Sequence, residues 1–275
     1  MKDKGFPFFR VFSWLIATGV AGIYAANKFG KGVKNFLEEK KDEDLDERRE
    51  RLIKENKNLP VGTVVDDQVL EETGIAPFFD KKKLSEHEFQ DMIGNSVPSD
   101  ISFDKNMLRV VRVLYFGFDE NTHIGEILVH RKIADDVMEI FFELYKKRYP
   151  IEKMRRIDYY AGDDNLSMSD NNTSGFNYRT IARTDRLSRH AKGMAVDINP
   201  RYNPYIYTIE EVTYCEPENG QKYADRDSDF PHKITHDDPC YQLFTKHGFK
   251  WGGDWKNRKD YQHFEYKKRK GNKNG

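Results

Sequence analysis

Two short runs that lie well apart in the chain contain residue types able to bind a metal ion. The first, 188–200, reads Ser-Arg-His-Ala-Lys-Gly-Met-Ala-Val-Asp-Ile-Asn-Pro, and the second, 251–265, reads Trp-Gly-Gly-Asp-Trp-Lys-Asn-Arg-Lys-Asp-Tyr-Gln-His-Phe-Glu. His190, Asp197 and His263 supply two imidazoles and one carboxylate, a ligand set suited to zinc. Three protein ligands leave the fourth tetrahedral position open for water, which separates a catalytic zinc site from a closed structural one. We therefore expect a zinc hydrolase.

The sequence around these ligands predicts strands that bring them together. Apolar residues alternate with small or polar ones over 194–199, which is the period of a half-buried strand, so Asp197 should project from its polar face. Gly193 stands where the chain must turn tightly or approach another segment closely. Such a turn would let His190 fold back over the strand. A second short alternation begins at His263.

A carboxylate beside the metal would complete a hydrolytic site. Zinc lowers the pKa of its water from 15.7 to roughly 7 and polarises the scissile carbonyl, while a nearby carboxylate passes the water's proton to the leaving amine. Asp260, three residues before His263, is the candidate for this general base, and Glu265 is the reserve. The alternative for Asp260 is an outer partner that orients His263 without touching the metal.

The two runs together resemble the D-alanyl-D-alanine carboxypeptidase family of zinc peptidases, which cut peptidoglycan stem peptides. The resemblance rests on Ser-x-His-x-x-Gly-x-Ala-x-Asp, Trp-Gly-Gly-Asp-Trp and Asp-x-x-His-Phe, and it covers roughly residues 100–266. It implies His190, Asp197 and His263 as zinc ligands. It also implies Asp260 as the general base.

Four further residues are candidates for contact with the substrate. The resemblance places Ser188 near the substrate and implies an upstream arginine that stabilises the substrate carboxylate or the oxyanion, for which Arg179 is the candidate. A structural ion pair is the alternative for Arg179. Trp251 and Trp255 would wall the cleft, and ordinary core packing is their alternative.

The first hundred residues predict an anchor and a spacer rather than a catalytic domain. Residues 11–26 carry no charge and favour an uncleaved membrane anchor, preceded by a cytoplasmic segment, 1–10. A cleavable signal peptide and a buried soluble helix are the alternatives. The charged stretch 27–60 is interpreted as an exposed stalk or, alternatively, a disordered linker, and 61–100 as an irregular approach segment.

The remaining sequence, 101–266, predicts one zinc peptidase domain of the α+β class. Strands are expected over 107–116 and 154–160, and a helix over 132–149, from β-branched content and from apolar residues at helical spacing. Strands carrying the metal ligands follow. We therefore expect an antiparallel sheet with flanking helices to carry the zinc site, followed by a basic tail, 267–275.

Composition limits the other classes of function. Lys and Arg together number 46, as do Asp and Glu, so the chain has no global basic field of the kind that favours nucleic acid binding. A metal-dependent nuclease is disfavoured for the same reason. Cys215 and Cys240 would form a disulfide outside the cytoplasm or, equally well, remain two free thiols.

These expectations describe a monomeric, membrane-anchored peptidase whose catalytic domain lies outside the cytoplasm. Its partners would be peptidoglycan stem peptides and the membrane, and its cofactor Zn²⁺. The rival of another class is a non-hydrolytic zinc-containing binding module at the cell envelope, because hedgehog signalling domains share this fold and ligand set. Retention of Asp260 favours the enzyme.

Overall fold

The computed structural model describes residues 45–181 and 184–267. By its internal contacts the chain divides into two compact units, residues 1–51 and 52–275. Helix α2 (Leu45–Lys57) has acidic residues in its first turn, basic residues in its last turn and no buried residue. This part of the predicted stalk is therefore an exposed helix whose charges complement the helix dipole.

The predicted anchor, 11–26, and the segment before it lie outside the described residues, as do residues 268–275 of the basic tail. Within the described part of the chain, no helix is both long enough and apolar enough to cross a bilayer.

The first sheet is antiparallel, with the order β1-β2-β3. It contains β1 (Asp80–Lys83), β2 (Leu108–Phe116) and β3 (Thr122–His130). Odd-numbered apolar residues of β2 and β3 face helix α5 (Ala134–Lys146) and share its core. The predicted strand over 107–116 and the predicted helix over 132–149 are confirmed, with slightly different ends.

The segment 61–100, expected to be irregular, instead covers the second face of this sheet. It contains α3 (Asp67–Thr73), the short helix η3 (Ala76–Phe78), β1 and α4 (Glu86–Gln90). Even-numbered residues of β2 and β3 contact its apolar side chains, among them Leu70 and Phe78. Because both faces of β2 and β3 are apolar, the chain needs a layer on each side, and this segment supplies one.

The predicted strand over 154–160 is wrong. Strand β4 (Lys153–Met154) pairs with β5 (Asn172–Thr173) over two residues each, and the chain then forms the short helix η5 (Ile157–Tyr160). Strand preference depends on a partner strand to pair with, and here the pairing ends after Thr173.

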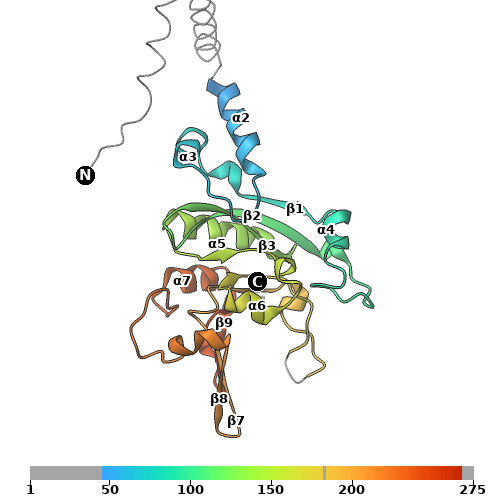
Figure 1. Cartoon of the computed structure of the whole chain (residues 1–275), viewed down its shortest axis with the longest axis vertical. Coiled ribbons are helices and arrows are strands. Elements are labelled where there is room, and N and C mark those ends of the chain that lie inside the picture. Colours follow the sequence, from blue (N-terminus) through green and yellow to red (C-terminus); the bar gives the residue numbers. More distant parts are fainter. Residues whose placement is uncertain (1–44, 182–183, 268–275) are drawn as a thin grey trace, which may run out of the picture. The chain divides into compact units, whose positions relative to one another are not determined.

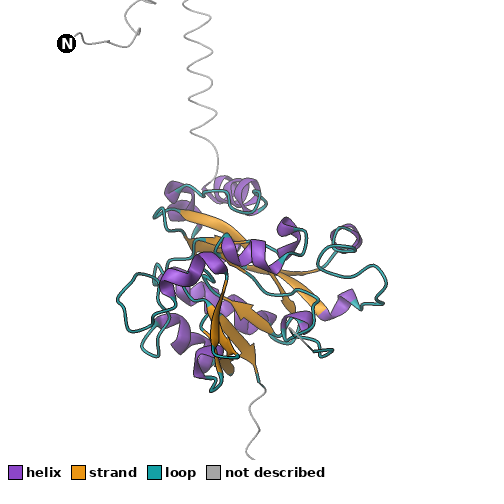
Figure 2. Ribbon diagram, turned by 60° about the horizontal axis from the view of Figure 1, so that its bottom comes forward, coloured by secondary structure: helices purple, strands orange, loops and turns teal. Residues whose placement is uncertain are grey.

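The second sheet has the order β6-β11-β9 and is antiparallel. Its strands are β6 (Ala195–Asp197), β11 (His263–Tyr266) and β9 (Phe249–Trp251). Helix α7 (Pro239–Lys246) packs against β9 and α5, so this sheet shares the core of the first. Figure 2 shows helices flanking the strands. The predicted α+β class is confirmed.

The third sheet, with the order β10-β7-β8, ends in a hairpin. Strands β7 (Tyr205–Ile209) and β8 (Val212–Glu216) project from the body in Figure 1, and β10 (Arg258–Asp260) pairs with β7. The two residues between β7 and β8 both have positive φ, as a two-residue hairpin turn of this kind requires.

Five short helices complete the described secondary structure. They are η4 (Lys105–Met107), α6 (Asp164–Ser169), η6 (His190–Lys192), η7 (Glu218–Tyr223) and η8 (Gly252–Asp254). Both cysteines are free thiols: Cys215 lies on β8 and Cys240 is buried in α7.

Candidate metal centre

Asp197 and His263 lie directly opposite each other on neighbouring strands. The register of β6 and β11 pairs these two residues, and side chains opposite each other on one face of an antiparallel pair are close neighbours. On its other edge, Asp197 exchanges two main-chain hydrogen bonds with Ser174, at 2.9 and 3.1 Å. The carboxylate is therefore fixed in the middle of a paired sheet rather than on a loop.

His190 reaches the same point from the short helix η6. The Ser188 hydroxyl accepts a hydrogen bond from the Ala191 N–H at 3.0 Å and so caps this turn. Gly193 ends the turn with a φ of 60°, and a Cβ there would lie 2.6 Å from the main-chain nitrogen of His130. Both expectations for Gly193, a tight turn and a close approach, are confirmed.

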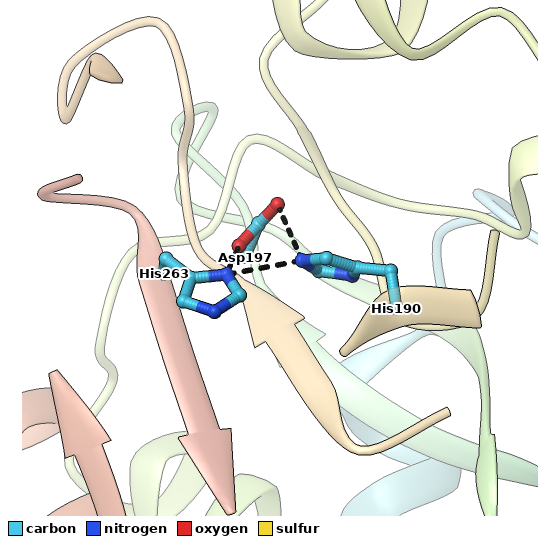
Figure 3. A group of neighbouring side chains, drawn as sticks. All are labelled: His190, Asp197 and His263. Atoms are coloured by element: carbon cyan, nitrogen blue, oxygen red, sulfur yellow. Dashed lines mark hydrogen bonds and ion pairs between the residues drawn. The ribbon is translucent and has the colours of Figure 1, made fainter. Parts of the chain in front are cut away.

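The three candidate ligand residues form a compact triangle in which each Asp197 oxygen faces a different imidazole (Figure 3). His190 Nε2 lies 3.0 Å from His263 Nδ1 and 3.1 Å from Asp197 Oδ2, and His263 Nδ1 lies 3.0 Å from Asp197 Oδ1. Ligand atoms held tetrahedrally at the usual zinc distances are about 3.3 Å apart. All three residues are buried. The group could therefore hold one metal ion with little movement of its side chains.

Hydrogen bonding leaves electron pairs directed at the centre of this triangle. His190 Nδ1 donates to the Gly175 carbonyl at 2.6 Å, so Nε2 is the ring nitrogen that faces Asp197 and His263. Without a metal, a proton on His263 takes the central place: burial lowers the pKa of His263, but Asp197 and Glu265 raise it to about 10. Burial also opposes ionisation of Asp197, yet its pKa stays far below the usual range because of His190 and His263. The arrangement therefore suits a positive charge at its centre.

Asp260 lies beside the triangle at the end of β10. Its Oδ1 atom is buried and accepts no hydrogen bond from the described residues. Burial raises its pKa to about 7, with the Asp197 charge adding to the rise and His263 opposing it. A Cβ on Gly252 would lie 2.5 Å from the Asp260 carbonyl oxygen, so glycine is needed for this approach. The carboxylate has the proton affinity that a general base near neutral pH needs.

Glu265, the reserve candidate, is held by cations. Its Oε1 lies 2.7 Å from Lys267 Nζ and its Oε2 lies 3.4 Å from Arg189 Nε. Burial raises the pKa of Glu265, but His263 and Lys267 outweigh burial and lower it to about 2. A carboxylate with so low a pKa is a weak base, so the environment favours Asp260 over Glu265.

Arg179 combines the two roles considered for it. Its Nη2 forms an ion pair with Asp164 at 2.8 Å, while its buried Nε has no hydrogen-bond partner among the described residues. Burial lowers the pKa of Arg179, but the carboxylates around it, foremost Asp164 and Asp197, raise it. The guanidinium therefore lies within electrostatic reach of the metal centre and is already anchored by one carboxylate.

The two tryptophans lie in different environments. Trp251 is buried in the core, where its indole N–H donates to the Tyr261 carbonyl at 2.8 Å, so it packs rather than walls a cleft. Trp255 is half-buried, and its ring centroid lies 5.4 Å from that of His263. Only Trp255 of this pair is placed to contact a molecule at the metal centre.

Some supporting residues were not singled out from the sequence. The Gly175 carbonyl orients His190, Asp164 anchors Arg179, and Arg189 and Lys267 neutralise Glu265. A main-chain carbonyl leaves no signature in the residue types. The two cations beside Glu265 could have been suspected, since both lie within a few residues of the metal motifs.

Comparison with known proteins agrees with the sequence motifs. Residues 182–266 match the family described as D-alanyl-D-alanine carboxypeptidase, which supports the resemblance seen in the sequence motifs. The matched range includes all three candidate ligands and Asp260. A search of curated proteins found no match, and a search of solved structures found none.

Proposed function

We propose that the chain is a zinc-dependent peptidase that hydrolyses peptide bonds in peptidoglycan stem peptides, as a D-alanine carboxypeptidase or as an endopeptidase. The family match supports a peptidase of this type. The buried His190, Asp197 and His263 group, which could hold a metal ion, supports metal-assisted hydrolysis.

Zinc fits the donor set better than the harder cations do. Two imidazole nitrogens and one carboxylate oxygen are typical zinc ligands, whereas Ca²⁺ and Mg²⁺ prefer oxygen alone. When bound, zinc supplies Lewis acidity that makes water more acidic and polarises a carbonyl group. The hydrogen bond from His190 Nδ1 to the Gly175 carbonyl fixes the ring so that Nε2 faces the centre.

Asp260 and Arg179 have the two other catalytic roles, proton transfer and stabilisation of negative charge. Asp260 takes a proton from the attacking water and delivers it to the leaving amine, which its raised pKa permits. Arg179 places a positive charge beside the site, where it balances the substrate carboxylate or the developing oxyanion. Trp255 forms one wall.

The single observation that carries the catalytic proposal is the buried Oδ1 of Asp260, which has no hydrogen-bond partner among the described residues. A buried polar atom without a partner is costly, and it persists where another molecule, here a water, completes its bonding. A non-hydrolytic binding module with the same ligands has no use for a second carboxylate with a buried oxygen beside the metal.

Location and partners follow from the same proposal. We place the catalytic unit outside the cytoplasm, held by residues 11–26 in the membrane, with the charged helix α2 as part of the spacer. The enzyme acts as a monomer, and the equal numbers of acidic and basic residues disfavour nucleic acid as a partner.

Hydrolysis of defined muropeptides by the zinc-loaded full-length chain tests this function. Mass spectrometry of the products would identify the scissile bond, and Asp260→Ala provides the matched inactive variant. We expect cleavage by the wild type and background cleavage by the variant, with one zinc per chain in both. Background cleavage by both proteins, with zinc retained, would instead establish the binding module.

A further inference from the structure

The β10-β7-β8 sheet carries Asp260 on a face that continues outward along the hairpin. Residues opposite each other across the strands share a face, and so do alternate residues along one strand. Asp260 lies opposite Tyr205, and Tyr205 lies opposite Glu216. The next row on this face consists of Arg258, Tyr207 and Tyr214.

The three tyrosines of this face form a continuous row of rings, which we call the tyrosine row: Tyr205, Tyr207 and Tyr214. The centroids of Tyr205 and Tyr207 are 4.8 Å apart, and those of Tyr207 and Tyr214 are 5.2 Å apart with nearly parallel planes. Tyr207 donates a hydrogen bond to Glu216 Oε1 at 2.7 Å. Tyr214 is 41% exposed, so the outer end of the row faces solvent.

The tyrosine row connects to the metal centre through two side chains. The Trp255 ring lies 5.4 Å from that of His263, and the Arg258 guanidinium lies 5.2 Å from the Trp255 ring. Arg258 in turn sits across from Tyr207 in the sheet. A ligand lying at the metal centre and extending past Trp255 would therefore pass over the row.

The opposite face of the same hairpin is different in character. It presents Ile206, Thr208, Thr213 and Cys215, none of which is aromatic. The rings are thus gathered on the face that carries Asp260. The two threonines provide matched control positions on the same strands.

We propose that the tyrosine row, with Arg258 and Glu216, is a binding subsite for the sugar rings of a glycan. Over Tyr205–Tyr207 the central strand is paired on both sides, and bound peptides usually pair with an open sheet edge rather than lie across a sheet face. A face of amphipathic rings flanked by one cation and one carboxylate suits pyranose rings, which offer an apolar face and hydroxyl groups at the rim. The inference rests on the proposed function, because the stem peptides that it cleaves are attached to a glycan chain.

Binding of a β-linked N-acetylglucosamine oligosaccharide to the metal-free, full-length chain tests the subsite without hydrolysis. We expect Tyr207→Ala combined with Tyr214→Ala to weaken binding roughly tenfold, because each aromatic contact contributes a few-fold. Thr208→Ala combined with Thr213→Ala should bind as the wild type does. Tyr214→Phe, which keeps the ring, should also bind normally. Circular dichroism checks each fold, and the exposed Tyr214→Ala replaces the double variant if that variant fails to fold.

Kinetics on two substrates separate sugar recognition from peptide recognition. The double tyrosine variant should raise KM for a glycan-linked stem peptide roughly tenfold, leave kcat unchanged and leave KM for the free peptide unchanged. An equal rise in KM for the free peptide would overturn the proposal, because the row would then bind peptide. Absence of oligosaccharide binding by the wild type would also overturn it. If the chain bound the sugar through these tyrosines but cleaved no peptide, the proposed peptidase function would be wrong and the proposed sugar subsite would be supported.

Discussion

The β1-β2-β3 sheet and the β6-β11-β9 sheet share one core but bury different kinds of side chain. The first has nine-residue strands, β2 and β3, with apolar side chains buried on both faces. The second has strands of three or four residues, with Val196 and Phe264 in the core and Asp197 and His263 on the other face. The apolar side chains buried by the first sheet stabilise the fold. This stabilisation offsets the cost of burying the charged side chains of the second sheet.

This difference predicts which substitutions should change the stability of the fold and which should change its activity. Burying a carboxylate and two imidazoles is costly unless they are paired or bind a cation. Removing apolar atoms from the first sheet and its helix should therefore lower stability and leave the metal centre intact. Removing a candidate metal ligand from the second should abolish zinc binding and activity.

The largest effect should follow from loss of a ligand. We expect His190→Ala or His263→Ala to reduce bound zinc from one per chain to near zero and peptidase activity to background. A chelator should do the same to the wild type, and added zinc should restore activity to the wild type alone. Elemental analysis and a peptide-release assay measure the two quantities. Full zinc content in either variant would contradict the assignment.

Asp260→Asn should retain zinc and lower kcat/KM by about 10²- to 10⁴-fold, the usual contribution of a general base. The base acts in its charged form, so wild-type activity should fall as the pH falls through its pKa. Burial raises this pKa to about 7, and a bound cation will bring it lower, so the acid limb should lie below pH 7.

The control for this variant is Glu265→Gln. Glu265 is already held by Lys267 and Arg189 and has a pKa of about 2, so its loss should act only through the position of His263. We expect a decrease of about 10- to 100-fold at most. A larger loss for Glu265→Gln than for Asp260→Asn would reverse the assignment.

Phe141→Ala tests the apolar half of the comparison. Phe141 lies in α5, is 1% exposed and contacts Phe244 edge-on. Its truncation should lower the free energy of unfolding by about 3–5 kcal/mol, measured by urea denaturation. Zinc content and kcat of the folded fraction should stay at the wild-type values, and a matching loss of kcat would show that the two sheets are not separable.

The smallest effect concerns a half-buried carboxylate outside the site, that of Asp238. Burial raises the pKa of Asp238, which caps α7, to about 6. A raised pKa means that the folded state loses stability as the pH rises from about 4 to about 6. Asp238→Asn keeps the cap but removes the charge, so it should stabilise the protein by about 1–3 kcal/mol at pH 8 and have no effect at pH 4. Its peptidase activity should be unchanged, unlike that of Asp260→Asn.

The sequence predicted most where residue type alone carries the information. His190, Asp197 and His263 stood in recognisable spacing, and in the structure one ligand atom from each lies within 4.8 Å of the other two. The strand over 107–116 and the helix over 132–149 followed from strong apolar patterns. Asp260 was found by its distance from His263 in the chain, and its buried environment could be seen only in the fold.

The features that the sequence did not predict depend on contacts between segments that lie far apart in the chain. The layer formed by 61–100 was missed because its few apolar residues follow no regular period, although they cover a whole sheet face. Trp251 and Trp255 have the same residue type and lie four positions apart, yet one lies in the core and the other beside His263. Only the pairing of β9 with β11 distinguishes them.

Because Asp197 and His263 pair directly across β6 and β11, metal binding depends on the correct register of these two strands. A shift of β11 by one position would set Gln262 or Phe264 across from Asp197 and turn the imidazole to the other side of the sheet. Such a misaligned chain would present two ligands instead of three. Zinc would therefore bind preferentially to molecules whose last strand had docked correctly, and its uptake during folding would draw the population toward that alignment.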